Sequence, residues 1–421
     1  MSKVRGAVAL LSLSVATFVA LPAAGGAASG AGTHWVGSWT AAPTNGGYQP
    51  LTDQTVRSII APHLAGSRVR VHLTNRFGVA PLVITGATIG TAAPGGGVAT
   101  GTLRTLTFSG RTSVTVPAGA DVVSDPVAAR VRPFTKLAVS TSVSGTVAKP
   151  TTHYTTREDN YATAVRSGDH SADLSGAAFT RSATPTGWFF LEGVDVTAAA
   201  RVASVVTFGD SITDGYQGRL APAGENLTTV GKEERYPDFL QRRVDAAGLP
   251  LSILNAGISG NRVLQDGSIP IFGPRALSRV GADAIDQPGV RTVIVFEGIN
   301  DIGQATGHAL TAAKLIAGYG RLVARLHHAH LRVLLGTLTP AGGAAAPGYG
   351  RTADRIRVPV NRWIRRQKDA DAVIDFDAAV RDPQRPSRIR PAYDGGDHLH
   401  FNAAGYRALA NAVPLKQLRS R

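Results

Sequence analysis

The sequence has no cysteine among its 421 residues. Disulfide bonds, thiolate metal sites and a cysteine nucleophile are therefore excluded. A chain of this length can be stabilised by its own hydrophobic core, and it is long enough for two domains of ordinary size. Long apolar runs are also missing after the N-terminus, so we expect no membrane-spanning helix in the mature protein and no stable membrane insertion.

The first 28 residues have the features of a secretory signal. Lys3 and Arg5 precede an apolar run over residues 7–21, and small residues fill most of residues 22–29. A charged region, an apolar region and a cleavage zone follow one another in this order in signal peptides. We therefore expect residues 1–28 to be removed and the protein to be secreted and extracellular.

Basic residues outnumber acidic ones by 44 to 29, which gives a formal net charge of +15. Such an excess can indicate a nucleic acid or an anionic surface as the partner. The basic residues are scattered, however, and are not interleaved with aromatics as they are in single-strand binders. The densest run, residues 362–366, is typical of the solvated face of a helix. We therefore expect no nucleic-acid partner, while the oligomeric state stays open.

Residues 34–200 have the pattern of an antiparallel β-sandwich. Residues 68–73 alternate polar and apolar side chains, as a half-buried strand does. Turns rich in glycine and proline separate many short runs of this kind, which indicates a sandwich, with a jelly roll as one form. The predicted strands cover residues 55–61, 68–74, 82–89, 103–108, 113–116 and 136–143.

Residues 201–421 have the alternating pattern of an α/β domain. Five apolar runs are separated by amphipathic helical patterns, which predicts a parallel sheet covered on both faces, in a flavodoxin-like order. Pro359 interrupts the helical pattern of residues 353–368 and predicts two shorter helices there. The junction at residues 194–203 has no Pro/Ser-rich linker. The predicted strands cover residues 202–208, 251–255, 290–296, 333–338 and 372–376.

Gly209-Asp210-Ser211 follows the first of these strands directly. A tight turn from a strand into a helix places one side chain beside the backbone N–H groups of the helix start. There the Ser211 hydroxyl could attack a carbonyl while these dipoles stabilise the oxyanion. The alternative is a serine that caps an ordinary helix.

Three further stretches lie where strands end or where the last helix begins: residues 254–261, 297–301 and 394–400. With Gly209-Asp210-Ser211 they resemble the four sequence blocks of the SGNH (GDSL) esterase and acylhydrolase superfamily. Ser211, Gly260, Asn300 and His400 match its four named positions in order. The resemblance covers residues 202–413, about half of the chain. It implies a flavodoxin-like SGNH hydrolase domain, ester hydrolysis, and neither a metal nor an organic cofactor.

A serine nucleophile needs a base, and histidine has a suitable pKa near 6.5. Of the two nearby candidates, His398 and His400, only His400 stands three residues after an acid, Asp397. Within one turn this spacing lets the carboxylate accept a hydrogen bond from the imidazole that faces Ser211. The predicted triad is therefore Ser211, Asp397 and His400, and the resemblance assigns the same pair. His398 is expected at the surface or in a supporting place.

The tetrahedral intermediate needs hydrogen-bond donors for its negative charge. We predict the N–H of Ser211, the N–H of Gly260 and the side-chain amide of Asn300. Gly260 can also be explained as a turn glycine, and Asn300 as the residue of an Asx turn. Both explanations are compatible with a role in the oxyanion hole. Asp210 and Asp301 are expected to brace their loops. Phe401 stands where the family commonly has proline, so the resemblance does not imply the path of that loop.

Two other groups of residues have structural interpretations as well. His327, His328 and His330 are typical of a solvated helix end, since no carboxylate accompanies them at metal-ligand spacing. Trp35, Trp39 and Trp188 are expected to pack within the β half or against its neighbour, with a sugar-stacking platform as the alternative.

The sequence thus predicts a secreted serine ester hydrolase that acts on a small-molecule or polymeric ester through an acyl-serine intermediate. The order of a β domain before an SGNH domain looks like that of some exported carbohydrate esterases, so deacetylation of glycans is one hypothesis. A lipid acylhydrolase or lipase is an alternative. A third is a non-catalytic polysaccharide-binding protein on a hydrolase fold.

Overall fold

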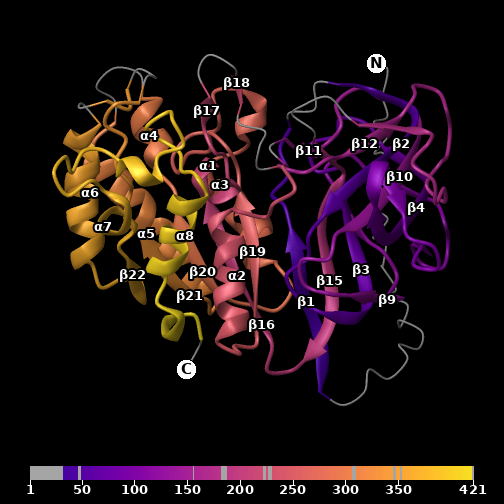
Figure 1. Ribbon diagram of the computed structural model, residues 1–421, viewed down its shortest axis with the longest axis horizontal. Helices are drawn as coiled ribbons and strands as arrows, with labels where there is room; N and C mark the ends of the chain where they lie inside the picture. The colour runs from indigo at the N-terminus through magenta and orange to yellow at the C-terminus, as the bar shows by residue number, and fades with distance from the viewer. Residues whose placement is uncertain are drawn as a thin grey trace, which may run out of the picture.

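The computed structural model describes residues 32–45, 49–154, 156–181, 187–220, 224–225, 230–305, 310–344, 348–350 and 353–419. The secretory signal predicted at residues 1–28 lies outside them. An all-β part and an α/β part lie side by side, the first from the N-terminal half of the chain and the second from the C-terminal half (Figure 1). Among the described residues, no helix is both long and apolar enough to span a membrane.

The β part is built from two antiparallel sheets that enclose one apolar core. The smaller sheet contains β1 (Thr33–Thr40), β15 (Leu191–Ala199), β3 (Gly66–Thr74), β8 (Asp121–Val123) and β9 (Val127–Val131). The larger contains β13 (Phe179–Arg181), β12 (Tyr161–Thr163), β2 (Leu51–Ile60), β10 (Leu137–Val147), β4 (Leu82–Ala93), β5 (Gly97–Val98), β6 (Arg104–Thr105) and β7 (Val114–Val116). A separate two-stranded ladder joins β11 (Thr152–His153) to β14 (Trp188–Phe189). The sandwich expected from the alternating runs is therefore present.

The α/β part contains a parallel sheet of five strands. In spatial order they are β19 (Leu251–Gly257), β16 (Ala203–Gly209), β20 (Val290–Phe296), β21 (Arg332–Gly336) and β22 (Ala372–Ile374). The second strand in sequence is thus at one edge, followed by the first, third, fourth and fifth, which is the expected flavodoxin-like order. A small hairpin of β17 (Arg219–Leu220) and β18 (Gly224–Glu225) follows the first helix.

Successive residues of β16 point to opposite faces of this sheet. Val206 belongs to a core cluster with α3 (Ala276–Val280), α5 (Ala312–His328) and α6 (Asp354–Arg366). Val205 belongs to a second cluster with α2 (Tyr236–Ala246), α7 (Phe376–Val380) and α8 (Ala403–Ala412). Both valines are fully buried, because a parallel strand covered by helices on both sides has no solvent-facing side chain.

The helix α6 runs without interruption through Pro359, so the two shorter helices predicted there are wrong. Pro359 is exposed, while the residues that hold the helix, Arg357, Val360 and Ile364, are buried on its inner face. Packing on both sides of the proline offsets the hydrogen bond that its ring removes.

The two parts are packed directly against each other. The strand β1 of the smaller β sheet lies beside β19, the edge strand of the parallel sheet (Figure 1). The contact is close because Gly37 on β1 has no side chain: a Cβ there would be 2.7 Å from Leu254. The Gly37 N–H also donates a 3.0 Å hydrogen bond to the carbonyl of Pro288.

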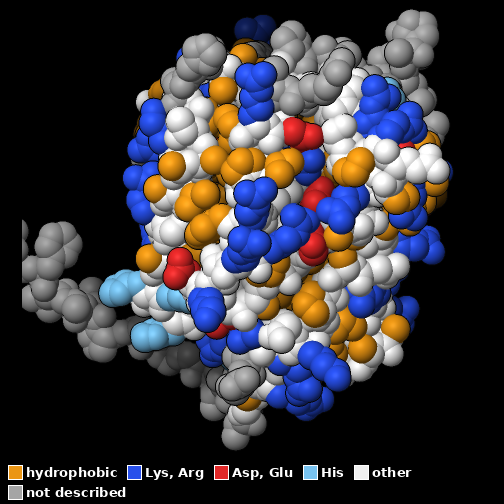
Figure 2. Space-filling model, turned by 90° about the vertical axis from the view of Figure 1, so that its left-hand side faces the viewer, with side chains coloured by type: hydrophobic (Ala, Val, Ile, Leu, Met, Phe, Trp, Pro, Cys, Tyr) orange, Lys and Arg blue, Asp and Glu red, His pale blue; other side chains and the backbone are white. Residues whose placement is uncertain are grey.

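Basic side chains are scattered over the face that carries α6 and α7, with apolar and a few acidic side chains between them (Figure 2). Arg365 on α6 pairs with Asp375 and Asp377, at 2.7 and 2.5 Å. Arg381 pairs with Asp377 as well, at 3.0 Å. Part of the positive charge is thus balanced locally, as on a solvated helix face.

Candidate active site

The predicted nucleophile lies in a tight turn at the carboxyl end of β16. The helix α1 (Ser211–Asp214) begins at Ser211, and the Asp210 carboxylate caps it by accepting a 3.0 Å hydrogen bond from the N–H of Ile212. Gly215, with φ of +97°, ends this single turn. Ser211 is thus held between the Asp210 cap and Gly215, and its hydroxyl is directed to His400.

Ser211, His400 and Asp397 form a continuous chain of hydrogen bonds. The Oγ of Ser211 is 2.8 Å from Nε2 of His400, and Nδ1 of His400 is 2.7 Å from Oδ2 of Asp397. A carboxylate can only accept, so Nδ1 carries the proton and Nε2 is free to take the one from Ser211. This arrangement can activate a serine hydroxyl.

The Asp397 carboxylate is also held by the backbone of its own turn. Its Oδ1 accepts hydrogen bonds from the N–H groups of Leu399 and His400, at 3.0 and 2.8 Å. Burial opposes ionisation, but the hydrogen bonds and charge of His400 outweigh it and hold the pKa of Asp397 well below its ordinary value. Asp397 therefore stays ionised across the neutral and mildly acidic range.

The two histidines of this turn point in different directions. His398 is about half exposed, and its Nδ1 lies 2.5 Å from the carboxylate of Asp394. His400 is buried, and the ring of Tyr216 packs edge-on against it with the centroids 4.6 Å apart. Only His400 reaches the serine, which agrees with the Asp-x-x-His spacing.

Two of the three predicted oxyanion donors, Gly260 and Asn300, lie just after β19 and β20, the two neighbours of β16. Gly260 has φ of +79°, and a Cβ there would be 2.2 Å from the ring of Phe272, so only glycine fits. Asn300 lies in the first turn of α4 (Ile299–Gly303). Its Oδ1 accepts from the Tyr349 hydroxyl at 2.6 Å, and its Nδ2 donates to the carbonyl of Asn261 at 3.0 Å. These contacts fix the orientation of the amide, whose Nδ2 carries a second hydrogen.

Asp301 braces the Gly260 loop from the side of α4. Its carboxylate accepts hydrogen bonds from the N–H groups of Val263 and Leu264, at 2.7 and 2.9 Å. Burial raises the pKa of Asp301 to about 6 and that of Asp210 to about 7. Both side chains hold backbone in place, as the sequence predicted.

Arg279 on α3 is a residue of the site that was not predicted from the sequence. Its guanidinium donates to the carbonyls of Gly209 and Ala256, both at 2.9 Å, and to Oδ1 of Asn261 at 2.8 Å. It pairs with Asp283 at 3.1 Å and Glu297 at 3.4 Å. One buried cation thus joins the turn before Ser211 to the loop that carries Gly260. No local motif marks it, because its partners come from four separate segments.

A cavity of about 410 Å³ is lined by residues that are close in sequence to Gly260 and Asn300. Arg262 and Asp301 form part of its wall, and α5 supplies Lys314 and Arg321. Its volume falls in the range of small-molecule sites. The wall combines basic, acidic and apolar side chains.

Three of the remaining sequence candidates have structural contacts. Trp39 and Trp188 are buried and meet edge to face, with their centroids 4.8 Å apart, so they form core. His327 pairs with Asp371 at 2.9 Å at the end of α5. Within the described part of the chain, no three His, Cys, Asp or Glu side chains are grouped as a metal site would require.

A hydrogen-bonded Ser–His–Asp chain thus lies at the strand ends of a flavodoxin-like sheet. Residues 207–408 match the model of the GDSL-like Lipase/Acylhydrolase family. A comparison with curated protein sequences found no significant match.

Solved structures similar to this chain include esterases of several kinds. A carbohydrate acetylesterase family member from Sinorhizobium meliloti is 18% identical, with 50% of this chain and 95% of that one covered and a TM-score of 0.39. The inhibitor-bound M. smegmatis aryl esterase is 17% identical, with 50% and 95% covered and a TM-score of 0.37. The acetyl xylan esterase AlAXEase is 20% identical, with 50% and 96% covered and a TM-score of 0.34. Likenesses at this level say nothing about the substrate of this chain.

Proposed function

We propose that this protein is a serine hydrolase that cleaves carboxylic esters through an acyl-serine intermediate. The observation that carries the proposal is the chain from Ser211 Oγ to His400 Nε2 and from His400 Nδ1 to Asp397 Oδ2, at 2.8 and 2.7 Å. The match of residues 207–408 to the model of an acylhydrolase family supports it.

The reaction follows from these contacts. His400 takes the proton of the Ser211 hydroxyl as Oγ attacks the ester carbonyl, and Asp397 stabilises the imidazolium that forms. The N–H groups of Ser211 and Gly260 and the amide of Asn300 donate to the oxyanion. When the intermediate collapses, His400 gives its proton to the leaving alcohol. Water then attacks the acyl-serine by the same route, which releases the acid and restores Ser211.

A non-catalytic role is the weaker alternative. A hydrolase fold that had become a polysaccharide-binding protein would have no need to keep Ser211, His400 and Asp397 together. All three are present and hydrogen-bonded in order. For the substrate we propose acetyl esters of glycans, with lipid esters as the competing class. We also propose that the protein is secreted, because residues 1–28 have the pattern of a signal peptide.

A fluorophosphonate probe tests the nucleophile. The wild-type protein should be labelled at Ser211, and Ser211→Ala should be unlabelled while unfolding at the same temperature. Labelling that persists in the variant would overturn the assignment. Rates on p-nitrophenyl esters of increasing chain length, beside acetylated xylan and a phospholipid, would then separate the glycan and lipid alternatives.

A further inference from the structure

The carboxylate of Asp214 joins three parts of the molecule at the end of the nucleophile helix. Asp214 is the last residue of α1, three positions after Ser211, and is buried. Its Oδ2 accepts hydrogen bonds from the N–H and the Oγ of Ser259, at 3.0 and 2.6 Å. Ser259 directly precedes Gly260. This single side chain therefore connects the turns that carry two of the oxyanion donors.

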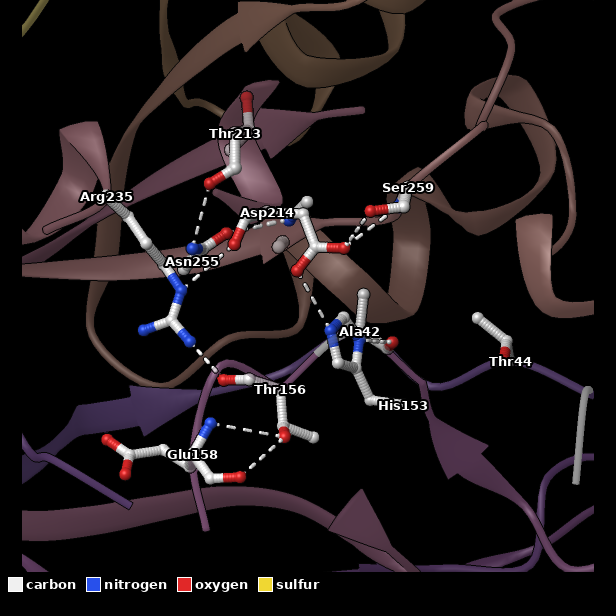
Figure 3. Close-up of polar contacts among 12 residues, drawn as sticks. Ala42, Thr44, His153, Thr156, Glu158, Thr213, Asp214, Arg235, Asn255 and Ser259 are labelled. Atoms are coloured by element: carbon white, nitrogen blue, oxygen red, sulfur yellow. Dashed lines mark hydrogen bonds and ion pairs between the residues drawn. The ribbon is translucent and has the colours of Figure 1, made fainter. Parts of the chain in front are cut away.

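The third contact of Asp214 comes from the β part. His153, on β11, points out of that part toward α1, and its Nε2 lies 3.0 Å from Oδ1 of Asp214 (Figure 3). Its Nδ1 lies 2.8 Å from the carbonyl of Ala42. A carbonyl and a carboxylate can only accept, so both ring nitrogens carry protons and His153 is a cation.

The charge on His153 fits its surroundings. Burial opposes protonation, but the charge and hydrogen bond of Asp214 outweigh it, and the pKa of His153 is raised above its ordinary value. The positive charge of Arg235 acts in the opposite direction and lowers the pKa of His153. Arg235 is itself part of the link: its Nε donates to the backbone carbonyl of Asp214 at 2.9 Å, and the other end of its guanidinium reaches the carbonyl of Thr156 (Figure 3).

His153 has no room to bind substrate. The space beside it, between Trp188 and Arg235, is a cavity of about 20 Å³, which holds no more than about one water molecule. Its effect on the reaction has to pass through Asp214.

We propose that His153 of the β part is a positioning residue for the oxyanion hole, acting through Asp214 on the turns of Ser211 and Gly260. This role rests on the proposed esterase function. Without the cation, the buried Asp214 carboxylate loses its ion pair with His153, while the nearby Arg235 donates to the Asp214 backbone carbonyl, and a carboxylate in this situation moves toward water or takes up a proton. Either change loosens its bonds to Ser259. A displacement of about 1 Å in a catalytic group can cost about 100-fold in rate.

The chain offers a matched control for this idea. His63 also comes from the β part, is equally buried, and forms the same kind of pair, with its Nε2 3.1 Å from Asp238 and its Nδ1 2.6 Å from the carbonyl of Ile253. Asp238 lies on α2, however, and its connection to the nucleophile helix is indirect: it accepts a 2.9 Å hydrogen bond from the N–H of Arg235, whose Nε donates to the carbonyl of Asp214. The two histidines share the chemistry and the interface, and differ in what their aspartate holds.

The test compares His153→Gln with His63→Gln in the full chain, using kcat and KM on p-nitrophenyl acetate together with thermal unfolding. Both variants should lose stability to a similar extent. Only His153→Gln should lower kcat, by about 10- to 100-fold, with KM within about twofold. Adding Asp214→Asn to His153→Gln should lower kcat no further than the larger single effect, because both act on one contact.

Equal kcat values in His153→Gln and His63→Gln would overturn the positioning role while leaving the esterase function intact. No ester hydrolysis by the wild-type protein would instead refute the proposed function, and this role with it. If His153→Gln does not fold, Ser259→Ala replaces it, because it removes a part-buried hydroxyl from the same carboxylate. A kcat equal to that of the wild type in Ser259→Ala would then count against the proposal.

Discussion

The hydroxyl of Ser211 and the Nε2 of His400 lie 2.8 Å apart, although 189 residues separate them in the chain. The nucleophile is fixed at the end of β16 and the histidine on the turn before α8. The parallel sheet and its last helix therefore have to be fully formed before the two can meet. We therefore expect catalytic activity to depend strongly on the intact tertiary structure of the α/β part.

The first prediction separates the two histidines of the Asp397 turn. His400→Ala should lower kcat by at least about 10³-fold, because it removes the base that is hydrogen-bonded to Ser211. His398→Ala should change kcat little, since that side chain is half exposed and pairs with Asp394. Steady-state kinetics of both variants on one ester measure this. A larger loss in His398→Ala would show that the wrong histidine was assigned.

The second prediction concerns Asn300. Asn300→Ala should lower kcat by about 10²- to 10³-fold with KM little changed, because an oxyanion donor acts mainly in the transition state. Tyr349→Phe is a milder companion, since it removes only the 2.6 Å hydrogen bond that orients the amide. A raised KM with unchanged kcat in Asn300→Ala would mean that the side chain binds the ground-state ester.

The third prediction concerns the buried cation at Arg279. Arg279→Met leaves the buried Glu297 without its cation and leaves Asp283 with Arg76 alone, which should lower the free energy of unfolding by about 3–5 kcal/mol. Arg365→Met is the control, because Arg365 also joins two carboxylates but is partly exposed, so its loss should be about 1 kcal/mol or less. Urea unfolding of both variants measures the difference. Similar losses would show that Arg279 is not the main brace.

The fourth prediction is that residues 201–421 do not work alone. Removing the β part would expose the β19 edge that β1 covers and would strip Asp214 and Asp238 of their histidine partners. We expect the fragment to be insoluble or strongly destabilised, with little esterase activity. A soluble fragment with kcat/KM near that of the full chain on a small ester would instead make the β part a separable accessory.

Some of the site was readable because its chemistry is local in the chain. Asp397 and His400 are three residues apart and meet within one turn, and Gly209-Asp210-Ser211 directly follows an apolar strand. The order of the five parallel strands also followed from their alternation with helices. In each case the information sits within a few residues or in a regular period, where sequence patterns are strongest.

The contacts that brace these blocks were decided only by the tertiary structure. Arg279 binds carbonyl and carboxylate oxygens from four segments of the chain. His153 contacts Asp214 across the interface of the two parts, and the two residues are 61 positions apart in sequence. Pro359 is tolerated in α6 because residues on both sides of it are buried. A buried charge is stable only where partners from distant segments converge on it, and no local pattern records that convergence. The sequence by itself therefore determined which groups can react, and the packing of the two parts decided what holds them in place.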